Sequence, residues 1–111
     1  MSTTFRFGHE RLDVYRVAVE FVAWSEKIDG RWFRGKQTRR EQLQRAADSI
    51  VLNIAEGAAQ KSRAARANHY RIAIGSAGEC RAILELLGLR KCPVNEGAAL
   101  LARIGAMLSK M

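Results

Sequence analysis

The apolar residues between about Ser62 and Gly88 constrain the fold of this chain more than any other feature. They recur in alternating steps of three and four residues: Tyr70, Ala73, Ala77, Cys80, Leu84 and Leu87. This spacing puts them on one face of a long helix and is typical of helical bundles and coiled coils. A second apolar stripe on the same segment, formed by Ile72, Ile83 and Leu86, predicts burial on more than one side.

Three further helices follow from the same periodicity, over Leu12–Ile28, about Arg39–Ala58, and Gly97–Met107. Thr38 with Glu41 would cap the second helix as a capping box, and Gly30 suits the left-handed position after the first. No segment alternates as a strand does. We therefore expect one domain over residues 1–111. Its fold class would be all-α, an antiparallel up-and-down four-helix bundle with a long third helix and a short fourth helix.

Polar residues run through the apolar faces of the second and third helices. Ser49, Asn53 and Glu56 stand at i, i+4 and i+7, and Ser76 and Glu79 stand at i and i+3. Burying such groups is unfavourable unless they are hydrogen-bonded. We expect them to form a structural polar network that sets helix register or joins subunits, with a functional site as the alternative.

Two details of this stripe lead to further expectations. Glu56 lies near the C-terminal end of its helix, where the helix dipole disfavours a carboxylate. A cation should therefore hold it, and the candidates are Arg45, Arg71 and Arg81. The two glycines beside Ser76, Gly75 and Gly78, would let another helix approach closely.

Positive charge is concentrated in the middle of the chain. The formal net charge is +8, and residues 31–71 hold ten Lys and Arg against three Asp and Glu. Such a cluster favours a polyanion, because phosphate contacts release counterions; ordinary solvated helix faces are the alternative. The candidate nucleic-acid-binding residues are Arg39, Arg40, Arg45, Lys61, Arg63 and Arg66.

An aromatic pair lies in the loop before the second helix. Trp32 and Phe33 stand between Arg31 and Arg34. Aromatic rings interleaved with arginines can stack on exposed nucleobases. Large aromatic side chains also bury readily, so the pair could instead cover the end of the bundle.

At four stretches, 12–18, 42–50, 53–57 and 72–79, the chain resembles the bacterial four-helix-bundle proteins encoded within intervening sequences of 23S rRNA genes. Those proteins are similar in turn to the accessory variability determinant of diversity-generating retroelements. The resemblance covers about residues 7–90. It implies a four-helix protomer with a basic surface, assembled as a cyclic homopentamer. In the retroelement proteins this surface engages a reverse transcriptase and nucleic acid. The resemblance supplies no catalytic residue.

Several kinds of site are not favoured by the sequence. Neither histidine has a Glu three residues before it, as a carboxylate-bridged metal site in a bundle requires. The spacings of a zinc site and of a phosphate-binding glycine loop are also missing. Arg63 and His69 do match the loose R-x(4–6)-H pattern of the HEPN ribonucleases, in which it supplies a base and a phosphate clamp. With many arginines in the chain, this match is unspecific.

Cys80 and Cys92 are expected to be reduced thiols, one in a helix and one in a loop. No apolar run is long enough for a membrane span, and the N-terminus lacks a signal-peptide core, so a cytoplasmic location is expected.

Taken together, these features lead us to expect a non-enzymatic, oligomeric bundle, without metal or cofactor, that binds RNA or DNA through phosphate contacts. An adaptor that docks a partner enzyme such as a reverse transcriptase is the main alternative, and a ribonuclease the remote one.

Overall fold

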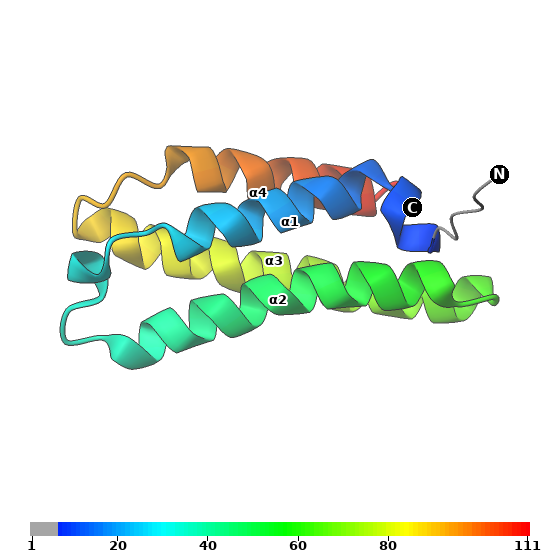
Figure 1. Ribbon diagram of the computed structural model, residues 1–111, viewed down its shortest axis with the longest axis horizontal. Helices are drawn as coiled ribbons and strands as arrows, with labels where there is room; N and C mark the ends of the chain where they lie inside the picture. Colours follow the sequence, from blue (N-terminus) through cyan, green and yellow to red (C-terminus); the bar gives the residue numbers. More distant parts are fainter. Residues whose placement is uncertain (1–6) are drawn as a thin grey trace, which may run out of the picture.

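The computed structural model describes residues 7–111, with only the backbone at Arg11. The described part contains four α-helices, two short 3-10 helices and no strand: η1 (Gly8–Arg11), α1 (Asp13–Glu26), η2 (Gly30–Phe33), α2 (Gln37–Ala59), α3 (Arg63–Leu89) and α4 (Asn95–Leu108). The expected all-α class with four main helices is confirmed. Each helix runs back along the preceding one (Figure 1), and contacts between neighbouring helices are compatible with the expected up-and-down arrangement.

The core lies along the axis of the bundle, where α1, α2, α3 and α4 meet. All six residues of the three-and-four spacing on α3 are buried, as predicted. The second stripe is only partly buried. Ile83 is inside, but Ile72 and Leu86 are 44% and 41% exposed. The protomer therefore covers one face of α3 fully and leaves part of its outer face uncovered.

The start of α3 agrees with the prediction and the start of α2 does not. Ser62 caps α3, and its hydroxyl accepts a hydrogen bond of 3.0 Å from the Ala65 amide. Thr38 lies inside α2, which begins at Gln37 and has Lys36 at its N-cap without a side-chain hydrogen bond, so the predicted capping box is wrong. The chain already reverses at Gly35, which has φ +75°. The helix can therefore begin before Thr38.

The connection after α1 also differs from the prediction. Gly30 is the first residue of η2 and has no left-handed conformation; Gly35 is the glycine with positive φ within residues 7–111. Asp29 caps η2, and its Oδ1 accepts a hydrogen bond of 2.9 Å from the Arg31 amide. A capped 3-10 turn therefore follows α1 where a simple glycine stop was expected.

The end of α3 is a Schellman turn. The Lys91 amide donates to the Gly88 carbonyl at 2.9 Å, and the Cys92 amide donates to the Leu87 carbonyl at 3.2 Å. Lys91 occupies the left-handed position with φ 75°, where glycine is usual. This turn brings Lys91 and Cys92 back toward η2.

Both cysteines are buried free thiols, Cys80 within α3 and Cys92 in the loop that follows, in agreement with the prediction. Burial raises the pKa of Cys80 to about 12. Its thiol is therefore protonated at neutral pH and is a poor nucleophile. Among the helices of residues 7–111, none combines the length and apolar character that a membrane crossing needs.

Candidate nucleic-acid interface

The six cations predicted from the sequence do not form one patch. Arg39 and Arg40 lie in the first turn of α2, whereas Lys61 and Arg63 lie beyond its C-terminal end. A helix of 23 residues is roughly 34 Å long, so the two groups are at opposite ends of the bundle (Figure 1). Arg45 lies between them, closer to Arg39. The cations that lie close together in the sequence are therefore split between the two ends of the bundle.

Arg66 has a structural contact that the sequence did not reveal. Its Nη1 donates to the carbonyl of Gln60 at 2.9 Å and to that of Lys61 at 3.2 Å. Free carbonyls at a helix end need such partners. Arg66 therefore closes the turn between α2 and α3, and its charge is partly committed there.

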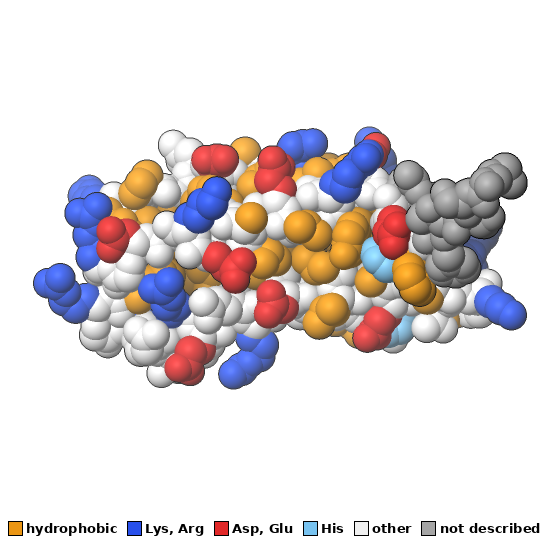
Figure 2. Space-filling model, viewed as in Figure 1, with side chains coloured by type: hydrophobic (Ala, Val, Ile, Leu, Met, Phe, Trp, Pro, Cys, Tyr) orange, Lys and Arg blue, Asp and Glu red, His pale blue; other side chains and the backbone are white. Residues whose placement is uncertain are grey.

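The structure gathers a different set of cations at the end of the bundle that carries η2. We call residues 26–41 and 89–96 the basic end; they hold eight Lys and Arg against four Asp and Glu. Figure 2 shows Lys and Arg side chains gathered at the left end of the molecule. Sequence reasoning missed Lys27, Arg90 and Lys91 as members of this cluster, because Arg90 and Lys91 are about fifty residues away from α2 along the chain. The cations of the basic end are Lys27, Arg31, Arg34, Lys36, Arg39, Arg40, Arg90 and Lys91.

Some of these cations hold the basic end together. Nη1 of Arg90 donates to the carbonyls of Trp32 and Arg34, at 3.2 and 2.9 Å, and so ties the end of α3 to the loop before α2. The Arg40 guanidinium lies 5.2 Å from the centre of the Phe33 ring. Arg31 pairs with the Asp29 carboxylate at 3.5 Å. These contacts give the loop a defined shape.

Other cations of the basic end are uncommitted. Within residues 7–111, Lys27 makes neither a side-chain hydrogen bond nor an ion pair, and the same is true of the exposed or half-buried side chains of Arg34, Lys36, Arg39 and Lys91. Three separate segments supply the last four, namely the loop after η2, the start of α2 and the turn after α3. The basic end thus presents several unpaired positive charges next to a loop whose shape is held by contacts of Arg31, Arg40 and Arg90.

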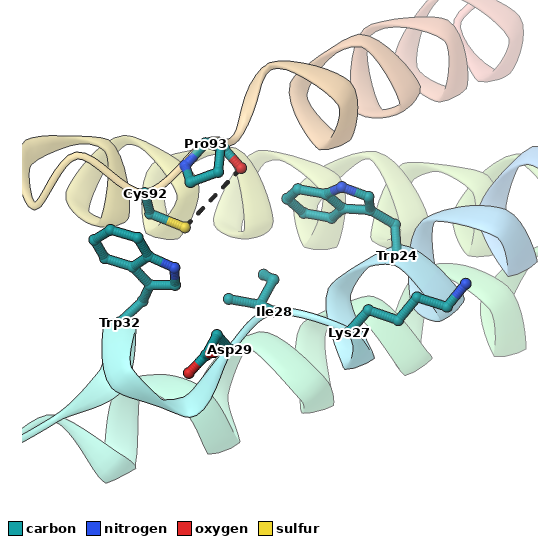
Figure 3. Close-up of a pocket in the computed structure, with 7 residues that line it drawn as sticks. All are labelled: Trp24, Lys27, Ile28, Asp29, Trp32, Cys92 and Pro93. Atoms are coloured by element: carbon teal, nitrogen blue, oxygen red, sulfur yellow. Dashed lines mark hydrogen bonds between the residues drawn. The ribbon is translucent and has the colours of Figure 1, made fainter.

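The aromatic pair of this loop has two different positions. Phe33 is 2% exposed and belongs to the core, as expected for a residue that covers the end of a bundle. Trp32 is half-buried and lines a cavity of about 260 Å³ together with Trp24, Ile28 and Cys92 (Figure 3). Phe33 therefore covers the end of the bundle, whereas Trp32 keeps an exposed ring surface that could stack on a nucleobase.

The structure also brings together three of the five residues of the predicted polar network. The Ser76 hydroxyl donates to Ser49 Oγ at 2.8 Å across the contact of α2 and α3. Asn53 Nδ2 donates to the Ser49 carbonyl at 2.9 Å and to Ser49 Oγ at 3.1 Å. All three side chains are half-buried. They link the two longest helices at a defined register.

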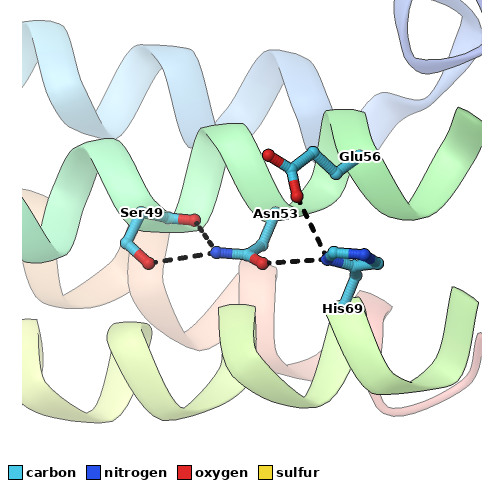
Figure 4. A network of polar contacts seen from close by, with 4 residues as sticks. All are labelled: Ser49, Asn53, Glu56 and His69. Atoms are coloured by element: carbon cyan, nitrogen blue, oxygen red, sulfur yellow. Dashed lines mark hydrogen bonds and ion pairs between the residues drawn. The ribbon is translucent and has the colours of Figure 1, made fainter. Parts of the chain in front are cut away.

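The other two residues, Glu56 and Glu79, are exposed. Glu79 makes no hydrogen bond or ion pair with the other residues of the stripe. Glu56 is held by His69, whose Nδ1 lies 3.4 Å from Glu56 Oε2 and 3.1 Å from Asn53 Oδ1 (Figure 4), and by none of the three arginines expected. The spacing of seven residues between His69 and Ser76 places both on one face of α3 and could have indicated this contact.

The glycines beside Ser76 are open. A Cβ atom added at Gly75 or at Gly78 would meet nothing within 4 Å. Within the described protomer no helix packs closely on these two glycines, although Gly78 lines a groove whose other wall is α4. The described residues also contain no group of three or more His, Cys, Asp and Glu that could hold a metal ion.

Comparison with known proteins supplies one match. A family model described as 23S rRNA-intervening sequence protein matches residues 10–110, nearly the whole chain. No curated protein matches the sequence, and no solved structure matches it.

Proposed function

Since the chain belongs to the 23S rRNA-intervening sequence protein family, we propose that it is a non-enzymatic bundle that binds nucleic acid, RNA or DNA, through phosphate contacts at its basic end. One observation carries this proposal: the uncommitted cations Arg34, Lys36, Arg39 and Lys91 lie on a loop framework held by Arg90. Charges without acidic partners can contact phosphates without first breaking an ion pair. Their origin in three segments makes a broad surface that suits a polyanion.

Phosphate contacts determine what kind of binding to expect. They position the nucleic acid but carry no direct sequence information. Each contact releases counterions, so the logarithm of the affinity falls linearly with the logarithm of the salt concentration, by about 0.7 to 0.9 per contact. Binding at the basic end should therefore be strongly salt-dependent and tolerant of sequence.

A pair of triple variants with the same change in charge tests the location of the interface. Log affinity falls with log salt, and replacing Arg34, Lys36 and Lys91 with Gln should make this fall shallower, by about 2 to 3 in slope. Replacing Lys61, Arg63 and Arg71 with Gln, which avoids the structural Arg66, should leave the slope nearly unchanged. Gel shifts of one RNA and one DNA strand at rising salt measure both slopes.

Two results of this experiment would contradict the proposal. If both triple variants lost affinity equally, the charge would act through the whole molecule. If the wild-type protein bound neither strand even at low salt, phosphate binding would be excluded. The adaptor alternative would then gain support. In that case the charge would serve to steer a partner enzyme, such as a reverse transcriptase, toward the bundle.

We further propose that the protomers assemble into a homo-oligomer, and the family resemblance favours a pentamer. The supporting observation is the outer face of α3, where Ile72, Leu86 and Leu89 are 44%, 41% and 79% exposed. Ile72 and Leu86 are fourteen residues, or two heptads, apart, and Leu89 follows three residues later, so the three share one helix face, on which the exposed Glu79 also lies. Exposed apolar surface of this kind commonly marks an interaction site.

Light scattering at micromolar concentration should return a multiple of the protomer mass of 12.4 kDa, and five times that mass for a pentamer. Leu86→Lys should shift the protein toward the protomer mass, since it puts a charge into the apolar face. Met111→Lys, at an exposed site near the C-terminus, is the matched control and should not. A wild-type mass of one protomer would exclude the oligomer.

A ribonuclease remains the remote alternative to this proposal. His69 Nδ1 lies between Asn53 and Glu56, and Arg63 precedes His69 by six residues. Residues six apart lie on different faces of a helix, because each residue turns the helix by about 100°. Within one protomer this arrangement gives the R-x(4–6)-H match little support as a catalytic pair. Cleavage of the RNA strand that is lost in His69→Ala would overturn the non-enzyme proposal.

A further inference from the structure

The cavity beside Trp32 lies within the basic end and has an aromatic, apolar lining. Figure 3 shows the Trp24 and Trp32 indoles on opposite sides of Ile28, with Cys92 and Pro93 along one edge. Lys27 and Asp29 complete the lining. The volume of about 260 Å³ is just below the ~300–1,000 Å³ of sites for drug-sized ligands. The cavity therefore suits one planar ring system better than a whole nucleotide.

Both indoles are held by neighbouring structure. The Trp24 ring packs directly over Gly97 in the first turn of α4, where a side chain would collide with it. Trp32 belongs to η2, which Asp29 caps and whose Trp32 carbonyl accepts a hydrogen bond from Arg90. The Arg31 guanidinium lies 5.4 Å from the centre of the Trp32 ring and does not line the cavity. The walls are thus positioned before any ligand binds.

We propose that this cavity receives one unpaired nucleobase of a single-stranded nucleic acid whose phosphates contact the basic end. This inference rests on the proposed function and adds to it a preference for single strands. Bases stack on aromatic side chains with little sequence preference. In a duplex the bases are stacked and paired, so none can enter such a cavity.

A second apolar groove on the molecule shows what is special about this cavity. It lies between α1 and α2, is lined by Val19, Val22, Val51 and Leu52, and has a volume of about 330 Å³. Hydrophobic side chains are visible over these helices in the middle of Figure 2. Its lining contains no aromatic ring and no cation, and its one charged member is Asp48. The cavity at the basic end, by contrast, combines aromatic walls with surrounding positive charge.

Intrinsic fluorescence provides a direct test, because the chain has two tryptophans and both line the cavity. A single-stranded RNA and the DNA of the same sequence should quench this fluorescence. A strand of equal length made only of abasic deoxyribose phosphates should not. The base-containing DNA should bind at least about fivefold more tightly than the abasic strand, given the usual contribution of base stacking. A duplex of the same sequence should bind without quenching.

Variants then assign the effect to the cavity. Trp32→Leu should reduce the preference for bases over abasic sites to near unity and leave the salt slope unchanged. Trp32→Phe, which keeps a ring, should retain most of the preference. Tyr15→Leu removes a half-buried aromatic ring from the start of α1, at the other end of the bundle, and should retain all of it.

The results also separate this inference from the proposed function. Equal affinity for the intact and abasic strands, with unchanged fluorescence, would overturn base capture and leave phosphate binding in place. A preference that survives in Trp32→Leu would overturn the cavity as its location. If neither strand bound at low salt, both proposals would fail together.

Discussion

Replacing Gly97 with alanine is expected to destabilise the fold by about 1–3 kcal/mol, as overpacking does in a tight interior. This is the opposite of the usual effect in a helix, where glycine is less favourable than alanine by about 1 kcal/mol. A Cβ atom at Gly97 would overlap the six-membered ring of Trp24, including Cε3 at 2.6 Å. The ring must then move away from α4, and the packing between α1 and α4 is lost with it.

Gly75→Ala is the matched control for this change. Gly75 is an exposed position in the interior of α3, and an added Cβ meets nothing within 4 Å. The substitution should therefore show the ordinary gain of about 1 kcal/mol. Urea denaturation of the wild type and both variants measures the two changes. Equal stabilisation by the two substitutions would show that Trp24 does not pack on Gly97 in solution.

Asn53→Leu is expected to lower the free energy of unfolding by about 1–3 kcal/mol, the typical result of leaving polar partners unsatisfied. The substitution removes both hydrogen bonds to Ser49 and the contact with His69. Ser49 keeps its bond to Ser76, so the network is weakened in its middle. Thermal or chemical denaturation measures the loss, and the gel shifts described above should change little.

Glu56→Ala is the comparison that separates the core of the network from its edge. The Glu56 side chain is 63% exposed, and its carboxylate contacts the His69 ring, an ion pair only when that ring is protonated. Exposed ion pairs contribute about 0–1 kcal/mol, so the variant should keep nearly wild-type stability. If Asn53→Leu instead kept its stability but lost nucleic-acid binding, the polar stripe would be a functional site.

Much of the fold could be predicted because helical periodicity is a local property. The spacing from Tyr70 to Leu87 correctly predicted the buried face of α3, and Ser62 correctly predicted where it begins. The two polar stripes meet at Ser49 and Ser76, since each lies on the face that its helix turns toward the other. Glu56 and Glu79 lie at the edge of that face, and the same periodicity placed them too far inside.

The candidate interface was less predictable, because charge close together in the sequence need not be close in space. Residues 31–71 span almost the whole of α2, so their cations lie at both ends of the bundle. Arg66 was assigned to the interface from its charge, but its position after the α2–α3 turn lets it bind two backbone carbonyls. Whether a cation is free or committed depends on neighbours that composition does not reveal.

The sequence by itself determined the helical class, the main buried face of α3 and the excess of positive charge. Those properties follow from side-chain spacing along a helix and from composition. Only the tertiary structure decided that Arg90 and Lys91 join the start of α2, that Phe33 is buried beside a half-exposed Trp32, and that Trp24 faces the same cavity. The reason is geometric: which helix ends meet depends on how the turns at η2 and Lys91 reverse the chain, and no local periodicity encodes those reversals.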